Sequence, residues 1–356
     1  MRGRIPLDSD MFFGRAHEIR RIEDKLAGDT PQCVSIIGER RIGKSSLAFR
    51  IFGKIKSSEN TLALYLDCDG LTEDCQSKDN FFGFLCEEFL GFNKNKTKIK
   101  EMQGFGKKKP FNNYESFRVF VRNTGERGIK TIIFMDEFEH LPNKKFADST
   151  FFSNLRALAT NPENHLAFVT ISQTPLYELT HTHKSIKYSK FWNIFYTEVI
   201  GLLPHKKIEQ LRKYGLEKTN IPFTVAEIEK IHHYAGDFPF FNQVACGFIW
   251  NFKRDEGGMD WDKLDVDIFP YYKKIWEDRT KEEQKLLKKT VELKKDFTHQ
   301  NLLTRGIIIK ENERCTPFST HFSQLIKKKF IIKRKKITLN KVIAIANRIA
   351  NIFKKG

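Results

Sequence analysis

The chain has 356 residues, a net charge of +18, 40% apolar residues and 33 phenylalanines. That much apolar sequence can bury more than one core, which excludes intrinsic disorder as the overall state. No apolar run reaches the roughly 18–20 residues of a membrane-spanning helix, and no signal-peptide stretch opens the chain. The six cysteines are scattered without a CxxC pair. We therefore expect a cytoplasmic protein of two or three domains, with reduced thiols and no transmembrane segment.

The positive charge is concentrated in two segments. Residues 301–356 carry 14 Lys and Arg against two acidic residues, and residues 91–110 carry seven Lys against one Glu. The remainder of the chain is close to neutral. Two interpretations stay open: contact with a polyanion, either nucleic acid or an anionic membrane face, and solvation of lysine-rich loops without any partner.

Short apolar runs alternate with helical patterns over the first 200 residues. Helices are predicted at 16–26, 44–57, 80–91, 114–125 and 149–160, and strands at 33–37, 62–66, 131–135, 166–171 and 196–200. Apolar runs of this length are typical of strands buried on both faces, and their alternation with helices predicts an α/β domain with a parallel sheet at 1–204. Residues 91–113 lack apolar periodicity and are rich in Lys, so we expect a basic mobile insertion there.

Helical patterns replace the strands after residue 204. They lie at 205–218, 224–234, 239–253 and 260–278, and they predict a small helical domain at 205–280. Residues 281–338 are predicted to form a winged helix-turn-helix, from helices at 281–293, 298–304 and 317–328 and strand-like segments at 307–310 and 330–338. Residues 339–356 are predicted to form a basic amphipathic helix, which could lie on a membrane, contact a partner or pack on its own domain.

The strongest chemical signal is the segment Gly38–Ser46, which fits GxxxxGK[ST] between a predicted strand and a predicted helix. Glycines in such a loop let backbone N–H groups surround a phosphate, and the helix N-terminus adds a positive dipole. Lys44 would neutralise the β- and γ-phosphates, and the Ser45 hydroxyl would help to bind Mg²⁺. We therefore expect ATP and Mg²⁺ to be bound by Gly38, Glu39, Arg40, Arg41, Ile42, Gly43, Lys44, Ser45 and Ser46.

A second predicted strand ends in two carboxylates, Asp136 and Glu137. Asp136 would hold Mg²⁺ through water, and Glu137 would act as the general base on the attacking water. Taken alone, such a pair could be a solvated turn, but the P-loop pattern upstream favours the catalytic interpretation. Lys44, Asp136 and Glu137 are therefore the candidate catalytic residues.

Together these motifs resemble the prokaryotic STAND type of P-loop ATPase, in the AAA+ branch related to origin-recognition ATPases. The segment Phe12–Ile19 resembles the F-x-G-R-x-x-E-I box that opens such domains, whose backbone usually lies near the adenine. The residues that this implies for nucleotide binding are Phe13, Gly14 and Arg15.

Two later segments extend the resemblance to residues 11–330. Gly236–Gln243 resembles the family's G-x-x-P-y-x-x-Q helix start, which implies that Pro239 approaches the nucleotide from a helical lid. Residues 305–319 resemble the winged helix that follows the lid.

The γ-phosphate sensor departs from the family pattern. Many STAND proteins place an arginine after the fourth strand, where this chain has Gln173. A glutamine can donate a hydrogen bond but cannot neutralise charge. Sensing would then be weaker, or would involve Thr170, Ser172, Gln173 or a residue of a neighbouring subunit, and Arg156 is a candidate arginine finger.

The resemblance implies a slow ATPase that acts as a switch, whose ATP or ADP state controls partner binding or self-association. It further implies a nucleotide-dependent homo-oligomer and a protein sensor or effector, with prokaryotic defence signalling as one setting. The alternative is an ATP-dependent DNA-binding protein of origin-recognition or transposition-helper type, acting through the winged helix. Its candidate contacts with a phosphate backbone are Lys327, Lys328, Lys329, Lys333, Arg334, Lys335 and Lys336.

Overall fold

The computed structural model describes residues 11–71, 75–93, 109–255, 259–293, 299–311 and 314–331. The chain divides into two compact units, 1–200 and 201–356, and each has buried apolar residues. Several predictions lie outside the described residues: most of the basic insertion, the amphipathic helix at 339–356, and the polyanion candidates Lys333, Arg334, Lys335 and Lys336, together with the side chain of Lys329.

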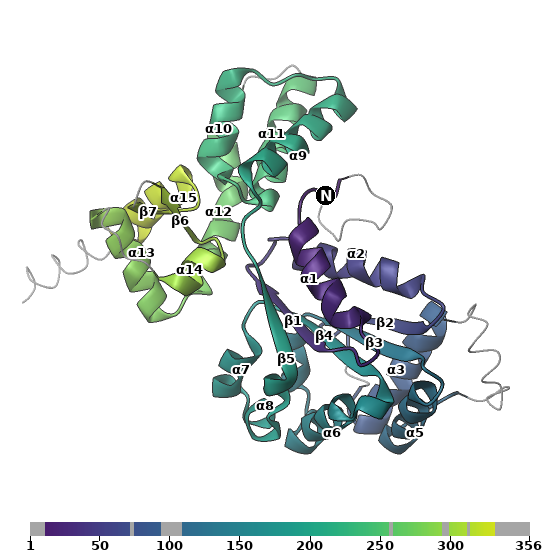
Figure 1. Cartoon of the computed structure of the whole chain (residues 1–356). Helices are drawn as coiled ribbons and strands as arrows, with labels where there is room; N and C mark the ends of the chain where they lie inside the picture. The colour runs from purple at the N-terminus through teal and green to yellow at the C-terminus, as the bar shows by residue number, and fades with distance from the viewer. Residues whose placement is uncertain are drawn as a thin grey trace, which may run out of the picture. The chain divides into compact units, whose positions relative to one another are not determined.

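The first unit is built on a parallel sheet (Figure 1). Its described strands are β1 Cys33–Gly38, β2 Thr61–Asp67, β3 Lys130–Asp136, β4 Leu166–Ser172 and β5 Phe195–Ile200, in the order β2-β3-β4-β1-β5. Every neighbouring pair is parallel. All residues of β1 and β4 are buried, as expected of strands covered on both faces. The five predicted strands are confirmed to within one residue at each end.

Helices cover both faces of this sheet. They are α1 Ala16–Ala27, α2 Lys44–Lys56, α3 Lys78–Asn93, α5 Tyr114–Gly125, α6 Ser149–Thr160, α7 Leu176–Thr182 and α8 Lys184–Ser189, with 3-10 turns η2 Phe138–Asn143, η3 Pro162–Asn164 and η4 Phe191–Ile194. Helices α1 and α2 lie on one face, and α5, α6 and α8 lie on the other (Figure 1). The ring of Phe82 packs 5.3 Å from that of Phe117 and 6.3 Å from that of Phe151, which joins α3, α5 and α6 into one aromatic core.

The strand order brings three chemically important strand ends to one edge. Because all strands are parallel, β1, β3 and β4 end together, at Gly38, Asp136 and Ser172. Strand β4 lies between the other two, so the loop after β1 and the carboxylates after β3 flank its end. A Cβ on Gly38 would lie 2.5 Å from the carbonyl oxygen of Ile200, so only glycine lets β1 pass this close to β5. Ligands of open α/β sheets bind outside this edge.

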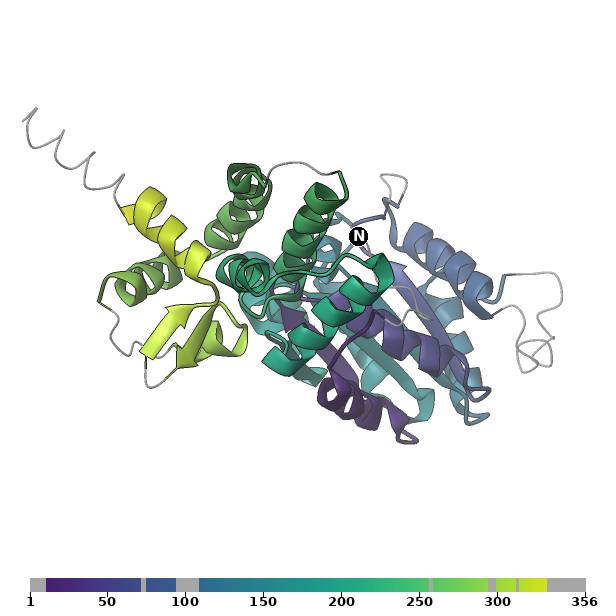
Figure 2. The same ribbon diagram turned by 90° about the horizontal axis from the view of Figure 1, so that it is seen from above.

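The second unit is mainly helical. Its elements are α9 His205–Thr219, α10 Val225–Ala235, α11 Pro239–Arg254, α12 Trp261–Glu277, α13 Lys281–Leu293, α14 Gln300–Thr304, β6 Ile308–Glu311, β7 Arg314–Pro317, α15 Thr320–Leu325 and the π-helix η5 Ile326–Ile331. Strands β6 and β7 form an antiparallel hairpin beside α13 and α15 (Figure 2). Across the described ranges no helix is both long and apolar enough to cross a bilayer. All six cysteines lie in the described ranges, where they are free thiols.

The predicted order of elements near residue 320 is wrong in part. We expected one helix over 317–328 and a strand from 330, but the strand that pairs with β6 is β7, which ends at Pro317. Ser319 accepts a backbone N–H 3.2 Å away, so α15 begins only at Thr320. Residues 330 and 331 continue η5 instead of starting a strand. The prediction failed here because a short apolar run does not distinguish a strand from a helical turn. The rest of that expected strand, 332–338, lies outside the described residues.

Candidate nucleotide site

The segment Gly38–Ser46 links β1 to the N-terminus of α2. Gly43 has a φ of +106°, which residues with side chains rarely adopt, and an added Cβ there would meet no atom within 4 Å. This glycine is therefore required by backbone conformation, while the space beside it is open. Arg41 also has a positive φ, +66°. The loop presents the N-terminus of a 13-residue helix at the edge of the sheet, which suits an anionic ligand.

The side chains of the loop divide into a buried and an exposed set. Glu39 and Ile42 are buried, whereas Arg40 and Arg41 are exposed. Arg15 supports the loop from the F-x-G-R box: it is only 7% exposed, and its Nη2 donates to the carbonyl of Ile42 at 3.3 Å. The box predicted to lie near the nucleotide thus contacts the loop through Arg15.

Lys44 begins α2 beside several acidic groups. Its Nζ donates to the carbonyl oxygen of Glu39 at 3.1 Å. Burial lowers the pKa of this ammonium, while the carboxylates of Glu139 and Glu137 act in the opposite direction. The amine is therefore held by a backbone carbonyl that a phosphate oxygen could replace. Ser45 and Ser46, which follow it on the helix, are partly buried.

Asp136 is the centre of a hydrogen-bond cluster. The Ser45 hydroxyl donates to its Oδ1 at 3.1 Å, and the Tyr65 hydroxyl donates to its Oδ2 at 2.8 Å. The main-chain N–H of Glu137 also donates to Oδ1, at 3.0 Å. The structure therefore brings together the two residues predicted to bind Mg²⁺. Tyr65 was not predicted as a site residue, because a tyrosine within the apolar run of β2 is expected to be an ordinary core residue.

Glu137 occupies a strained and partly buried position. Its φ of +49° lies in the left-handed region that residues other than glycine seldom adopt. Burial raises the pKa of its carboxyl group, the carboxylate of Glu139 raises it further, and the ammonium of Lys44 lowers it. A base whose pKa is shifted toward neutrality is well suited to proton transfer near neutral pH.

Glu139 connects this cluster to the end of β4. Its Oε1 accepts the main-chain N–H of Gln173 at 3.2 Å, and its Oε2 is buried without a hydrogen-bond partner among the described residues. Of the sensor candidates, Ser172 donates to the carbonyl of Thr174 at 2.7 Å, and Thr170 is fully buried with its hydroxyl unpaired in the described structure. Glu139 is thus a third acidic group at this site, and the sequence pattern, which points only to Asp136 and Glu137, did not predict it.

The remaining candidates lie outside this cluster. Gly14 has a φ of +72°, so the chain turns sharply just before α1, and the neighbouring Phe13 is partly buried. Arg156 on α6 donates from Nε to Asn193 Oδ1 at 3.3 Å. Pro239 is the first residue of α11, in the second unit.

Comparison with known proteins gives a family match over part of the chain. Residues 119–285 match the family model described as Novel STAND NTPase 2. The resemblance to STAND-type ATPases is confirmed. The matched segment contains Asp136, Glu137 and Glu139 of the first unit and the helix start at Pro239 of the second. No curated protein matches this sequence.

Solved structures show which fold this chain has. A Walker-type ATPase of Pyrococcus abyssi is similar with a TM-score of 0.56 and 15% identity, over 89% of this chain and 96% of that one. The ORC2 protein of Aeropyrum pernix in its ADP form is similar with a TM-score of 0.52 and 11% identity, over 97% of this chain and 88% of that one. At such identities the likeness establishes the fold alone: the parallel α/β fold of P-loop ATPases.

Proposed function

We propose that this protein binds ATP at Gly38–Ser46 and hydrolyses it slowly, as a STAND-type switch. The observation that carries the proposal is the hydrogen bond from Ser45 Oγ to Asp136 Oδ1, 3.1 Å long, between residues 91 positions apart. It joins the helix of the candidate phosphate loop to the acidic end of β3. Lys44 and Glu137 adjoin these two residues in the chain, so one edge of the sheet carries all four groups.

The donor set at this edge fits Mg²⁺. Hydroxyl and carboxylate oxygens are the ligands that Mg²⁺ prefers, together with water and phosphate. Ser45 would bind the ion directly and Asp136 would bind it through water, while the Tyr65 hydroxyl keeps the carboxylate oriented. When bound, the ion would neutralise charge on the phosphates.

Lys44 and Glu137 would have different roles in hydrolysis. The ammonium of Lys44 would exchange the carbonyl of Glu39 for β- and γ-phosphate oxygens. Glu137 would orient the attacking water and accept its proton, as its raised pKa favours. The open space beside Gly43 leaves room for a phosphate at the N-terminus of α2.

The switch would begin at the end of β4. Gln173 follows this strand, and its main chain is held by Glu139, two residues after the proposed base. A γ-phosphate that displaced this contact would change the position of Gln173. By resemblance to STAND proteins, Pro239 would then report the nucleotide to a helical lid at 205–280 and a winged helix after it. Partner binding or nucleotide-dependent self-association would follow from that lid position.

The proposal is tested by ATP binding to a Lys44→Ala variant. Calorimetry of Mg²⁺ and ATP should show tight binding by the wild type and none by this variant, because the variant lacks the cation placed for the phosphates. Lys54→Ala is the matched control, since it removes the same charge from the far end of α2, where Lys54 pairs with Glu23. Equal ATP affinity in the wild type and Lys44→Ala would exclude this loop as the site.

A DNA-dependent function is a second candidate, favoured by the charge near the C-terminus. Residues 327–336 hold seven Lys and Arg within ten positions. Of these, Lys327 and Lys328 are described, and both are exposed on η5. In this case ATP would set the affinity for duplex DNA, and duplex DNA would raise the ATPase rate. If the switch instead controls only protein partners, duplex DNA should leave the ATPase rate unchanged.

A further inference from the structure

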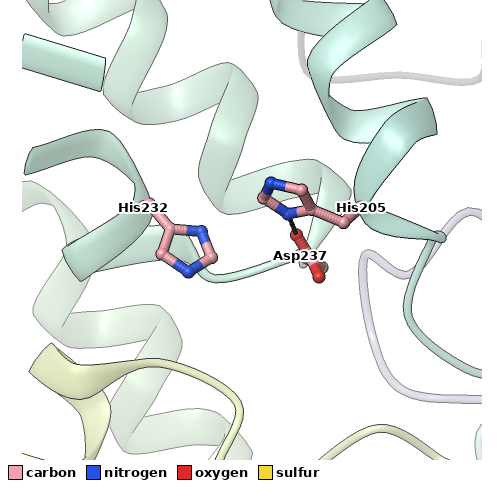
Figure 3. Close-up of side chains that lie close together, drawn as sticks. All are labelled: His205, His232 and Asp237. Carbon is pink, nitrogen blue, oxygen red and sulfur yellow. Dashed lines mark hydrogen bonds and ion pairs between the residues drawn. The ribbon is translucent and has the colours of Figure 1, made fainter. Parts of the chain in front are cut away.

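A cluster of possible metal ligands lies in the second unit, and its member Asp237 is two residues before Pro239. His205 is the first residue of α9, His232 lies in the last turn of α10, and Asp237 lies in the turn before α11. One donor atom from each lies within 4.8 Å of the other two. Figure 3 shows the two imidazole rings and the carboxylate gathered around a common space.

The backbone that carries these groups is held in one arrangement. The N–H of Leu203 donates to the carbonyl of Asp237 at 3.4 Å, which places the start of α9 beside the turn. Gly236 has a φ of +50°, and a Cβ there would lie 1.9 Å from the carbonyl oxygen of Phe318. Asn242 Nδ2 donates to the carbonyl of Gly236 at 2.9 Å. The turn therefore holds Asp237 at a fixed place beside His205, with Nδ1 and Oδ1 2.8 Å apart.

The charges around the cluster favour a cation. His205 Nδ1 lies 2.8 Å from Asp237 Oδ1, and its Nε2 lies 3.6 Å from Glu209 Oε1. The guanidinium of Arg212 is also near, and it donates to Asn242 Oδ1 at 2.7 Å. Two carboxylates thus face one guanidinium.

We propose that His205, His232 and Asp237 bind a divalent transition metal, with Zn²⁺ as the best-matched ion. Two imidazole nitrogens and one carboxylate oxygen are a ligand set that Zn²⁺ uses in proteins, and water or Glu209 can fill the fourth position. Zinc bonds of about 2.0–2.2 Å place tetrahedral ligands about 3.3 Å apart, so the three groups must move closer than they lie now. Both histidines are exposed and can do so by side-chain rotation. Magnesium prefers oxygen ligands and does not suit this set.

Zinc titration of the full chain tests the site. For this experiment the protein is prepared without a histidine tag, and a chelator removes bound metal before the chelator itself is removed. ATP is left out because nucleotides bind metals. Elemental analysis after desalting should find one Zn²⁺ per chain, and the midpoint of thermal unfolding should rise with Zn²⁺ because the ion joins α9 to the α10–α11 turn.

Variants assign that zinc to the three side chains. Loss of even an outer partner of a metal ligand typically costs about 10–100-fold in affinity, so His205→Gln, His232→Gln and Asp237→Asn should each weaken binding at least tenfold. His17→Gln, a change of an exposed histidine on α1, should not. Lys44→Ala should also bind zinc normally, so this result is independent of the ATP site.

Two results would overturn the proposal: a wild type that binds no stoichiometric zinc, or His205→Gln and His232→Gln variants that bind it with wild-type affinity. The second result would point to ligands elsewhere, such as a thiol. Thermal unfolding without metal shows whether each variant is folded. If one of the three ligand variants is not folded, the zinc affinities of the other two decide the test.

Discussion

The carboxylate of Glu139 influences how firmly Glu137 holds a proton. It is the second cause, after burial, of the raised pKa of Glu137. Since the proposed base must be ionised to accept a proton, ATP turnover should fall on acidification through that pKa, above the usual carboxyl value of 4.5. Glu139→Gln keeps an oxygen for the Gln173 N–H and removes the charge. The acid limb of the rate profile should therefore move to lower pH, and an unmoved limb would contradict this coupling.

Tyr65 is expected to act on the metal through Asp136. Tyr65→Phe removes the hydroxyl that donates to Asp136 Oδ2 but keeps the ring, which stacks on Phe134 at 5.8 Å. Because the carboxylate then loses an orienting partner, the Mg²⁺ concentration for half-maximal ATPase rate should rise about tenfold. Tyr188→Phe, at an exposed tyrosine, should leave it unchanged. An unaltered magnesium requirement in Tyr65→Phe would show that Asp136 does not depend on this hydroxyl.

At the scale of elements, the two glycines of the β1–α2 loop are required for different reasons. Gly38→Ala places a methyl group 2.5 Å from a backbone oxygen of β5, so it should lower the free energy of unfolding by roughly 3 kcal/mol. Gly43→Ala meets no atom within 4 Å and is destabilised only by its positive φ, by about 1–3 kcal/mol. Denaturant unfolding measures both.

Gly83→Ala is the control for this comparison. It lies within α3 and meets no atom, so it should stabilise by about 0.5–1 kcal/mol. If Gly38→Ala were as stable as the wild type, the close approach of β1 to β5 would not be what requires glycine there.

Strands β1 to β4 of the parallel sheet could be predicted from the sequence because each is mainly an apolar run, whereas β5 is interrupted by Thr197 and Glu198. Strand β7, Arg314–Pro317, is instead short and only partly buried, and it pairs through a hairpin that composition does not mark. The same distinction holds at the site. The segment Gly38–Ser46 and the pair after β3 are local patterns, whereas the contacts of Tyr65 and Glu139 arise only once β2, β3 and β4 lie side by side.

At the scale of the whole molecule, the basic C-terminal segment makes the DNA interpretation testable. If four to six of its cations meet phosphates, log K for duplex binding should fall with log salt at a slope of about −4 to −5, from roughly −0.9 per contact. Replacing Lys333, Arg334, Lys335 and Lys336 with Gln should weaken all duplexes alike and flatten that slope.

The matched control alters the other basic segment, by replacing Lys94, Lys96, Lys98 and Lys100 with Gln. It should leave the slope unchanged. A membrane role predicts instead binding to acidic liposomes that is lost when 339–356 are deleted. If neither duplex DNA nor acidic liposomes bind at low salt, the charge is a solvated surface and the DNA function is wrong.

The central claim is that one edge of the sheet both binds ATP and hydrolyses it. The most direct measurement compares ATP affinity and phosphate release in the wild type and in Glu137→Gln. The account predicts slow release by the wild type, and similar ATP affinity but release slower by about 10²–10⁴ in the variant, since binding is kept and the base is lost. Release by the variant within a few-fold of the wild type would contradict it.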